Sequence, residues 1–149
     1  MISKDELLKG RDKQYVSDYT QEISNNLDKL LVPLNQIRTA YGKPMTVTSG
    51  WRPPAINSST PGAAAKSKHM IGLACDISDP DGVLMKWVLQ NLPLMKSLGI
   101  YMEDFRWTPN WVHFQLGVPG SGKRIFVPSS APAGAPGKWD GKYDSQFDT

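Results

Sequence analysis

The sequence predicts one α+β domain, in which a small antiparallel sheet packs against N-terminal helices and one central helix. Apolar residues before residue 42 recur at spacings of three and four, which is typical of helices. Most segments that alternate apolar and polar residues, or are rich in β-branched and aromatic residues, come later in the chain. A chain of 149 residues is long enough to bury a hydrophobic core without disulfides.

Two helices are predicted in the N-terminal part. Ser3 and Glu6 fit a capping box, in which the serine caps the first amides of a short helix and the glutamate reaches back. A longer amphipathic helix is predicted over residues 20–41 and is followed by a glycine and a proline that end it. Pro33 lies inside this helix and predicts a kink or a split near Val32.

The rest of the chain predicts strands with one helix between them. Residues 50–67 read as a long polar loop, and such loops are usually functional. The helix is predicted over residues 79–92, capped by Asp79 or Asp81. The predicted strands are 45–49, a segment within 72–78, 100–104, 111–116 and a short fifth strand within 124–128.

Composition limits the function. The formal net charge is only +3, and no run of lysines or arginines suggests a nucleic-acid partner. No apolar run approaches the roughly 20 residues of a membrane span, and no signal peptide is visible at the N-terminus. We therefore expect a protein made in the cytoplasm of its host, with no membrane partner. The chain divides into a domain over residues 1–127 and, over 128–149, a Pro/Ala/Gly linker with an aromatic arm that could dock in a larger assembly.

The stretch SKHMIGLACD holds His69, Cys75 and Asp76, and it admits three interpretations: a metal site, a cysteine nucleophile, or a strand without a catalytic role. On one continuous strand, His69 and Asp76 would face opposite sides because their spacing is odd. They converge only if the chain turns between them, and Gly72 is the residue where it can turn. Cys75 is expected to pack as a small apolar side chain on the face opposite Asp76.

The second histidine favours the metal interpretation. His113 lies in the strand pattern WVHFQL, where it shares a face with Trp111 and Gln115. Two histidines and one carboxylate are the three protein ligands of a catalytic zinc site. Glu103 is the best candidate for a general base, and Arg52 could hold a substrate carboxylate or a developing oxyanion.

These motifs resemble the M15 family of zinc peptidases. The family pattern is S-G-[YW]-R, then S-x-H-x-x-G-x-A-x-D, an acidic residue and W-x-H. Here it falls on residues 49–52, 67–76, 103 and 111–113. The family includes D-alanyl-D-alanine carboxypeptidases and phage or bacterial endopeptidases that act on peptidoglycan stem peptides, and it shares its metal-site architecture with hedgehog signalling domains. The resemblance covers roughly residues 2–116, including an N-terminal part similar to that of phage members.

The resemblance implies a role for each matching residue. His69, Asp76 and His113 would hold one zinc ion per chain, Glu103 would be the base, and the substrate would bind Arg52 with Ser67 lining the site. Several members carry an acidic residue three positions before the last histidine, where this chain has Asn110, and others place it on the preceding strand, as Glu103 would be. Whether Glu103 or Asp104 is the base stays open, as does the choice between exopeptidase and endopeptidase.

The expected function is therefore a zinc metallopeptidase that degrades the cell wall, working as a bacteriophage endolysin or a lytic enzyme carried in the virion. The alternative is a non-catalytic, zinc-containing module that binds the cell wall or forms part of a phage structure. A third hypothesis, nucleotide binding by GVPGSGKR, is disfavoured because Arg124 stands where a phosphate-binding loop needs serine or threonine. A turn that borders the site explains this glycine-rich segment better.

Overall fold

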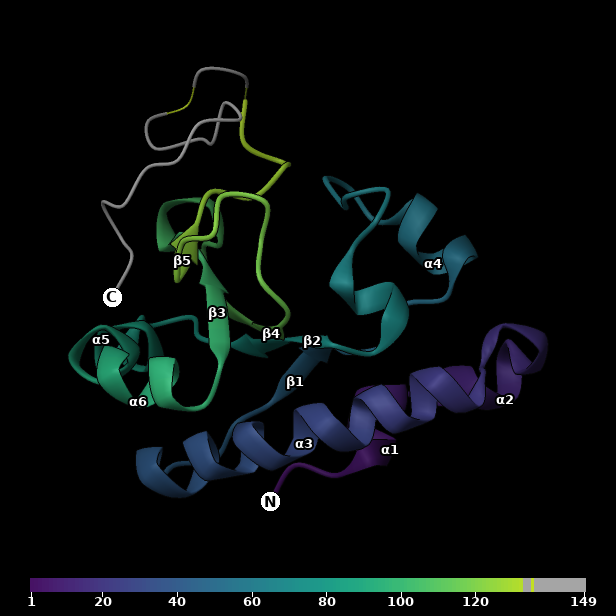
Figure 1. Cartoon of the computed structure of the whole chain (residues 1–149), viewed down its shortest axis with the longest axis horizontal. Coiled ribbons are helices and arrows are strands. Elements are labelled where there is room, and N and C mark those ends of the chain that lie inside the picture. The colour runs from purple at the N-terminus through teal and green to yellow at the C-terminus, as the bar shows by residue number, and fades with distance from the viewer. Residues whose placement is uncertain (133–134, 136–149) are drawn as a thin grey trace.

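A computed structural model describes residues 1–132 and residue 135 (Figure 1). The predicted aromatic arm lies outside these residues. Three short 3₁₀ helices join the α-helices and strands: η1 (Val16–Asp18), η2 (Lys68–Ile71) and η3 (Phe105–Trp107). The other elements are α1 (Lys4–Leu8), α2 (Arg11–Gln14), α3 (Gln21–Tyr41), β1 (Val47–Ser49), α4 (Pro54–Ser59), β2 (Ala74–Ser78), α5 (Val83–Gln90), α6 (Leu92–Ser97), β3 (Ile100–Glu103), β4 (Trp111–Leu116) and β5 (Ile125–Phe126).

The strands form one sheet in the order β1–β2–β4–β3–β5. Its three central pairings are antiparallel, and the edge strand β5 pairs with β3 in parallel. The chain reverses after β4 and passes to the far side of β3, so β5 runs in the same direction as β3. The predicted α+β fold with a mostly antiparallel sheet is confirmed.

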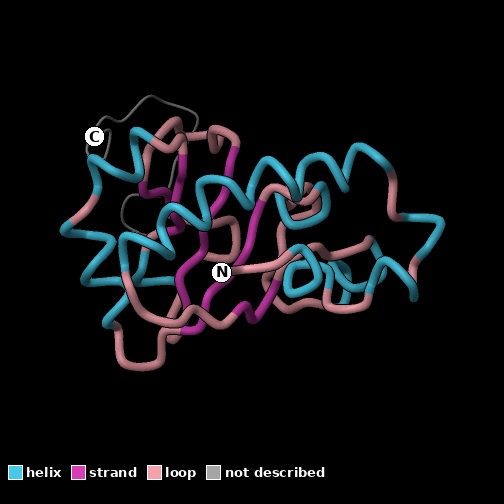
Figure 2. Tube along the Cα trace, turned by 90° about the horizontal axis from the view of Figure 1, so that it is seen from below, coloured by secondary structure: helices cyan, strands magenta, loops and turns pink. Residues whose placement is uncertain are grey.

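Helix α3 provides most of the helical layer beneath the sheet, and it crosses the strands in Figure 2. The Thr20 hydroxyl caps it by accepting the amide of Ile23 at 3.2 Å, and Gly42 ends it with φ of 75°. The helix is continuous through Pro33, so the predicted split does not occur. A proline removes only one helical hydrogen bond, and the turns on either side are fixed by the fully buried Leu30, Leu34 and Ile37.

The predicted capping box at the N-terminus is confirmed. The Ser3 hydroxyl accepts the Glu6 amide, and the Glu6 carboxylate accepts the Ser3 amide at 3.1 Å. Leu7 and Leu8 of this short helix are buried in the core that α3 shares with the sheet.

The predicted loop over residues 50–67 is partly wrong, because it contains α4. Pro54 occupies one of the first helical positions, where its missing N–H is not needed. The Asn57 amide then donates to the Ala64 carbonyl at 2.9 Å and closes the loop on itself. A helix of six residues is too short to show a helical period in the sequence.

Helices α5 and α6 cover one end of the sheet (Figure 1). Helix α5 begins at Val83 with Gly82 as its N-cap residue, later than predicted. The Asp79 carboxylate still accepts the amides of Leu84 and Met85, both at 2.9 Å, so an aspartate satisfies the first amides of this helix as expected. The predicted single helix ends at Gln90, and α6 follows as a separate element. No helix within the described part of the chain has the length and apolar character needed to cross a membrane.

Candidate metal centre

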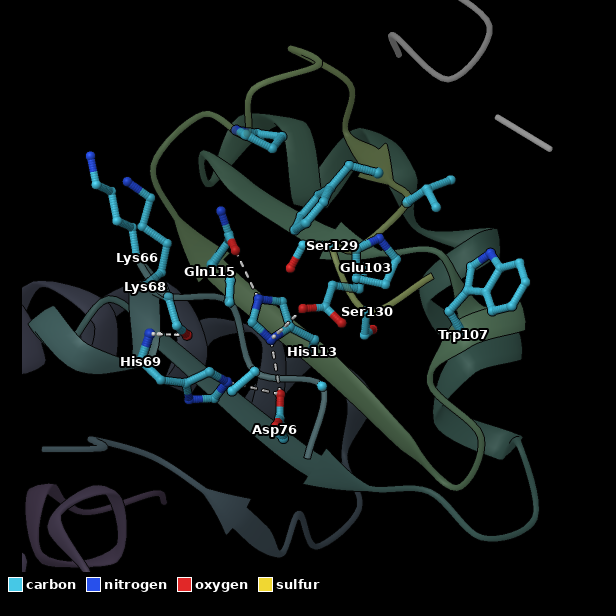
Figure 3. A pocket seen from close by; sticks show the side chains of 18 of the residues that line it. Lys66, Lys68, His69, Asp76, Glu103, Trp107, His113, Gln115, Ser129 and Ser130 are labelled. Atoms are coloured by element: carbon cyan, nitrogen blue, oxygen red, sulfur yellow. Dashed lines mark hydrogen bonds and ion pairs between the residues drawn. The ribbon is translucent and has the colours of Figure 1, made fainter. Parts of the chain in front are cut away.

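The sheet order brings three titratable side chains into one row. Asp76 of β2 is the register partner of His113 of β4. On the other side of β4, the register pairs Met102 with Phe114, and one further step places Glu103 beside His113. Partners directly opposite each other in an antiparallel pair point to the same face. His113 therefore lies between two carboxylates, as Figure 3 shows.

His69 reaches this row from η2, outside the sheet. The chain turns at Gly72, which has φ of 80° and ends η2 before β2 begins. A side chain at this position would also meet the carbonyl oxygen of Ile23 at 2.9 Å. The turn brings His69 Nε2 to 3.3 Å from Asp76 Oδ1, so the predicted convergence around Gly72 is present.

A backbone carbonyl fixes the orientation of the His69 ring. His69 Nδ1 lies 2.8 Å from the carbonyl oxygen of Gly50. A carbonyl oxygen can only accept, so Nδ1 carries the proton and the lone pair on Nε2 points toward Asp76. Gly50 in turn lies against the backbone of Leu7, where no β-carbon would fit, and the Trp51 amide donates to the Leu7 carbonyl at 2.9 Å.

A hydrogen bond with Gln115 fixes the orientation of the His113 ring. Its amide nitrogen donates to the Gly117 carbonyl at 3.0 Å, which turns its oxygen toward His113 Nε2 at 2.8 Å. His113 Nδ1 consequently faces Asp76 Oδ1 at 2.9 Å. The sequence placed Gln115 on the same face as His113 but gave no sign of this role, which depends on the bend at Gly117.

The three residues fit a metal ion. One ligand atom each from His69, Asp76 and His113 lies within 4.8 Å of the others, and all three side chains are largely buried. Both histidines are held from behind by a hydrogen-bond acceptor, which is the usual support of metal-binding imidazoles. Two imidazole nitrogens and one carboxylate oxygen suit zinc better than magnesium or calcium.

The same contacts, together with burial, shift the pKa values of the three candidate ligands in the metal-free centre. Burial would lower the pKa of His113, but Glu103, Asp76 and the Gln115 hydrogen bond outweigh it and raise the pKa to about 9. Both ring nitrogens then donate, and the proton on Nδ1 occupies the position toward which a metal would bind. Burial lowers the pKa of His69 despite Asp76. Burial would raise the pKa of Asp76, but the two histidines hold it well below its usual range.

Glu103 and Asp104 have different surroundings. Glu103 Oε1 lies 3.5 Å from His113 Nδ1, and its side chain lines the cavity above the metal centre. Asp104 is buried and binds the Arg106 guanidinium through both carboxylate oxygens, at 3.0 and 2.7 Å. Only Glu103 of the two has a carboxylate that faces the candidate ligands.

Arg52 and Ser67 form the wall next to His69. The Arg52 amide donates to the His69 carbonyl at 3.0 Å, and its guanidinium donates to the Ser67 hydroxyl at 3.3 Å. The same hydroxyl accepts the His69 amide at 3.2 Å. Burial lowers the pKa of Arg52, while Asp76 and Glu103 act in the opposite direction. Its Nε is buried and has no hydrogen-bond partner among the described residues.

These residues line a cavity of about 760 Å³. One wall comes from the segment 60–69, and the other from η3, Phe126 and the loop 118–121. Trp107 and Trp111 line it, whereas Trp51 is fully buried and donates to the Met70 carbonyl. The predicted glycine-rich turn thus borders the cavity. Cys75 is fully buried on the opposite face of β2, where burial raises the pKa of its thiol.

Comparison with known proteins agrees with this arrangement. A family model described as Peptidase M15 matches residues 3–114, about three-quarters of the chain. Searches of curated proteins and of solved structures find no match. The matched segment contains Arg52, Ser67, His69, Asp76, Glu103 and His113, and it ends one residue before Gln115.

Proposed function

Because this chain belongs to the peptidase M15 family, we propose that it is a zinc-dependent peptidase that hydrolyses peptide bonds in peptidoglycan stem peptides. The observation that carries the proposal is the convergence of His69, Asp76 and His113 on one point, with the carboxylate of Glu103 beside them. Neighbouring carboxylates and imidazoles that are structural alone are not usually arranged around an open cavity of this size.

In this proposal, His69 Nε2, His113 Nδ1 and an oxygen of Asp76 bind the zinc ion. Bound zinc supplies Lewis-acid activation of a water molecule and of the scissile carbonyl group. Gly50 and Gln115 orient the two imidazoles so that the correct nitrogen of each ring faces the ion. Because His113 is protonated in the metal-free centre, it must release the Nδ1 proton before it can bind a metal.

Glu103 acts as the general base in the same proposal. Its carboxylate accepts a proton from the attacking water and delivers it to the nitrogen of the leaving amine, which is the standard task of a positioned carboxylate in such a site. Arg52 orients the substrate, because its side chain lines the cavity and its guanidinium lies beside Ser67 in the wall. Developing negative charge on the carbonyl oxygen is stabilised by a donor of this kind.

A digestion assay tests the enzyme proposal. Purified muropeptides are incubated with the zinc-loaded protein, and the products are identified by mass spectrometry. We expect defined stem-peptide fragments from the wild type and a loss of about 10²- to 10⁴-fold in rate for Glu103→Gln, because the base is removed. The matched control is Glu22→Gln, an exposed carboxylate in the first turn of α3. Absence of stem-peptide fragments from both the wild type and Glu103→Gln would favour the non-catalytic wall-binding module, and equal cleavage by both would reject Glu103 as the base.

A bacteriophage lytic enzyme, either a free endolysin or a virion component, is the proposed setting of this activity. The support is the similarity of the N-terminal helical part to phage members of the family. We expect the protein, added from outside, to clear bacterial cells whose outer barrier has been permeabilised. Clearing should be measured as a fall in turbidity, and it should be abolished by a zinc chelator and restored by added zinc. Muropeptide cleavage without any lysis would argue for a different setting.

A further inference from the structure

The two ends of the cavity around the candidate metal centre are lined by different kinds of side chain. Lys66 and Lys68 lie on the side of His69, and Trp107 lies on the opposite side beyond Glu103 and His113 (Figure 3). The lysines flank Ser67, which Arg52 contacts, so the cationic side chains of the cavity are grouped on one wall. A peptide bound across the metal centre therefore meets positive charge on one side only.

The two lysines are not neutralised within the described part of the chain. None of the ion pairs found there involves Lys66 or Lys68. The carboxylates that share the cavity are Asp76 and Glu103, and both face His113. Neither carboxylate forms an ion pair with Lys66 or Lys68 among the described residues.

The position of Lys68 is defined by packing. Its side chain passes over Gly117, whose φ of 98° turns the chain after β4. A β-carbon at Gly117 would lie 3.2 Å from Lys68 Cε and 3.4 Å from Nζ. The lysine therefore bridges from the η2 wall to the loop after β4. Gly117 also accepts the hydrogen bond that orients Gln115, so this bridge lies at the edge of the metal centre.

We propose that Lys66 and Lys68 form a subsite for a free carboxylate of the substrate peptide, which makes this peptidase selective for anionic peptides. This inference rests on the proposed peptidase function. An ammonium group on a flexible stem binds a carboxylate as a point charge without a fixed geometry, which suits either a C-terminal or a side-chain carboxylate.

Stem peptides offer both sources. The pentapeptide L-Ala-γ-D-Glu-diaminopimelate-D-Ala-D-Ala carries a C-terminal carboxylate, a free α-carboxylate on its glutamate and another on its diaminopimelate. Replacing one of these by a neutral amide of nearly the same shape removes the charge alone. The probes are the parent pentapeptide and the three peptides in which a single carboxylate is amidated.

Binding is measured by calorimetry on zinc-loaded Glu103→Gln, so that no probe is cleaved, with and without Lys66→Gln and Lys68→Gln together. We expect the lysine replacements to weaken binding of the parent peptide by about two- to fivefold, the upper part of the range for exposed ion pairs. They should not weaken binding of the one amidated peptide that lacks the partner carboxylate. The matched control is Lys29→Gln, an exposed lysine on α3.

The amidated peptide whose binding is unchanged by the lysine replacements identifies the carboxylate that the lysines bind. Insensitivity of the C-terminal amide indicates recognition of the chain end, as a carboxypeptidase needs, and insensitivity of an internal amide indicates recognition of that internal carboxylate. Equal effects of the lysine replacements on all the peptides, or no effect on any of them, would overturn the subsite. If the parent peptide binds with the expected lysine dependence but the wild type never cleaves it, the subsite stands and the peptidase proposal fails.

Discussion

On the face of the sheet toward α3, Cys75, Ile77, Val112 and Phe114 are fully buried among apolar side chains. On the opposite face of the same two strands, Asp76 and His113 line an open cavity. The apolar face is specified by short-range periodicity, since alternate strand residues pack against helix residues at spacings of three and four. The polar face depends on which strands are neighbours. The packing that stabilises the fold therefore lies on one face of the sheet, and the candidate site lies on the other face.

The largest expected effect tests the apolar face. Leu34→Ala should lower the free energy of unfolding by about 2–5 kcal/mol, because Leu34 is fully buried between α3 and the sheet and its loss leaves a cavity. Val32→Ala, two residues away and 64% exposed, should change it by less than about 0.5 kcal/mol. Urea unfolding of the metal-free proteins measures both. Zinc affinity of folded Leu34→Ala should equal that of the wild type, and a large loss would show that the two faces are coupled.

A smaller effect is expected from the hydrogen bond behind the metal centre. Gln115→Met should lower zinc affinity by about 10- to 100-fold, because His113 loses the acceptor that orients its ring. Gln115→Glu keeps an acceptor at this position and should bind zinc nearly as well as the wild type. Competition with a chromophoric chelator gives the affinities. Gln90→Met, at the end of α5, is the control for the change of side chain.

If Gln115→Met and Gln115→Glu lose affinity equally, the glutamine acts through packing and not through its oxygen. If neither loses affinity, the ring of His113 is held by its strand alone. Either result would mean that Gln115 serves packing and not the candidate site. Its side chain is on the polar face of the sheet and is nevertheless buried.

The smallest effect, counted per pH unit, concerns pH, and its sign differs between the metal-free and metal-bound proteins. The pKa of His113 is raised to about 9 in the metal-free centre. The stability that its charge contributes is complete below the unfolded value of about 6.5 and is lost as the pH rises toward 9. Zinc must displace this proton, so its apparent affinity should rise about tenfold per pH unit over the same interval.

Calorimetry in buffers of different ionisation enthalpy measures the protons released. We expect about one proton per zinc bound near neutral pH. Gln115→Met should release less, because the Gln115 hydrogen bond is one of the causes that raise the pKa of His113. Release of no proton by the wild type would mean that His113 is neutral before the metal binds, and the tautomers assigned above would need revision.

Much of the fold follows from the sequence. The amphipathic pattern of α3, the capping box at Ser3 and the alternation within β4 are local signals, and each matches the structure. The elements that escaped prediction are those without a period, such as α4, which has only six residues. The continuity of α3 through Pro33 depends on burial of the neighbouring leucines, which a propensity argument does not include.

The candidate site was predictable only in part. The residues in recognisable motifs could be named, but the position of Glu103 beside His113 depends on β3 pairing with β4, and the sequence contains no direct signal of that pairing. The difference between Glu103 and Asp104 depends on the ion pair with Arg106. The side chains of Gln115 and Lys68 both lie against the bend at Gly117, and no spacing rule relates these three residues.

The close contact between Gly50 and Leu7 has a practical consequence for anyone who trims or redesigns this protein. The carbonyl that orients His69 belongs to Gly50, which packs against Leu7 of the first helix. That helix is distant in sequence from the residues that line the cavity. Deleting the first eight residues would remove none of the candidate ligands and not Glu103, yet it would remove the backbone of Leu7 against which Gly50 packs. The shortest useful version of this protein is therefore longer than its list of site residues suggests.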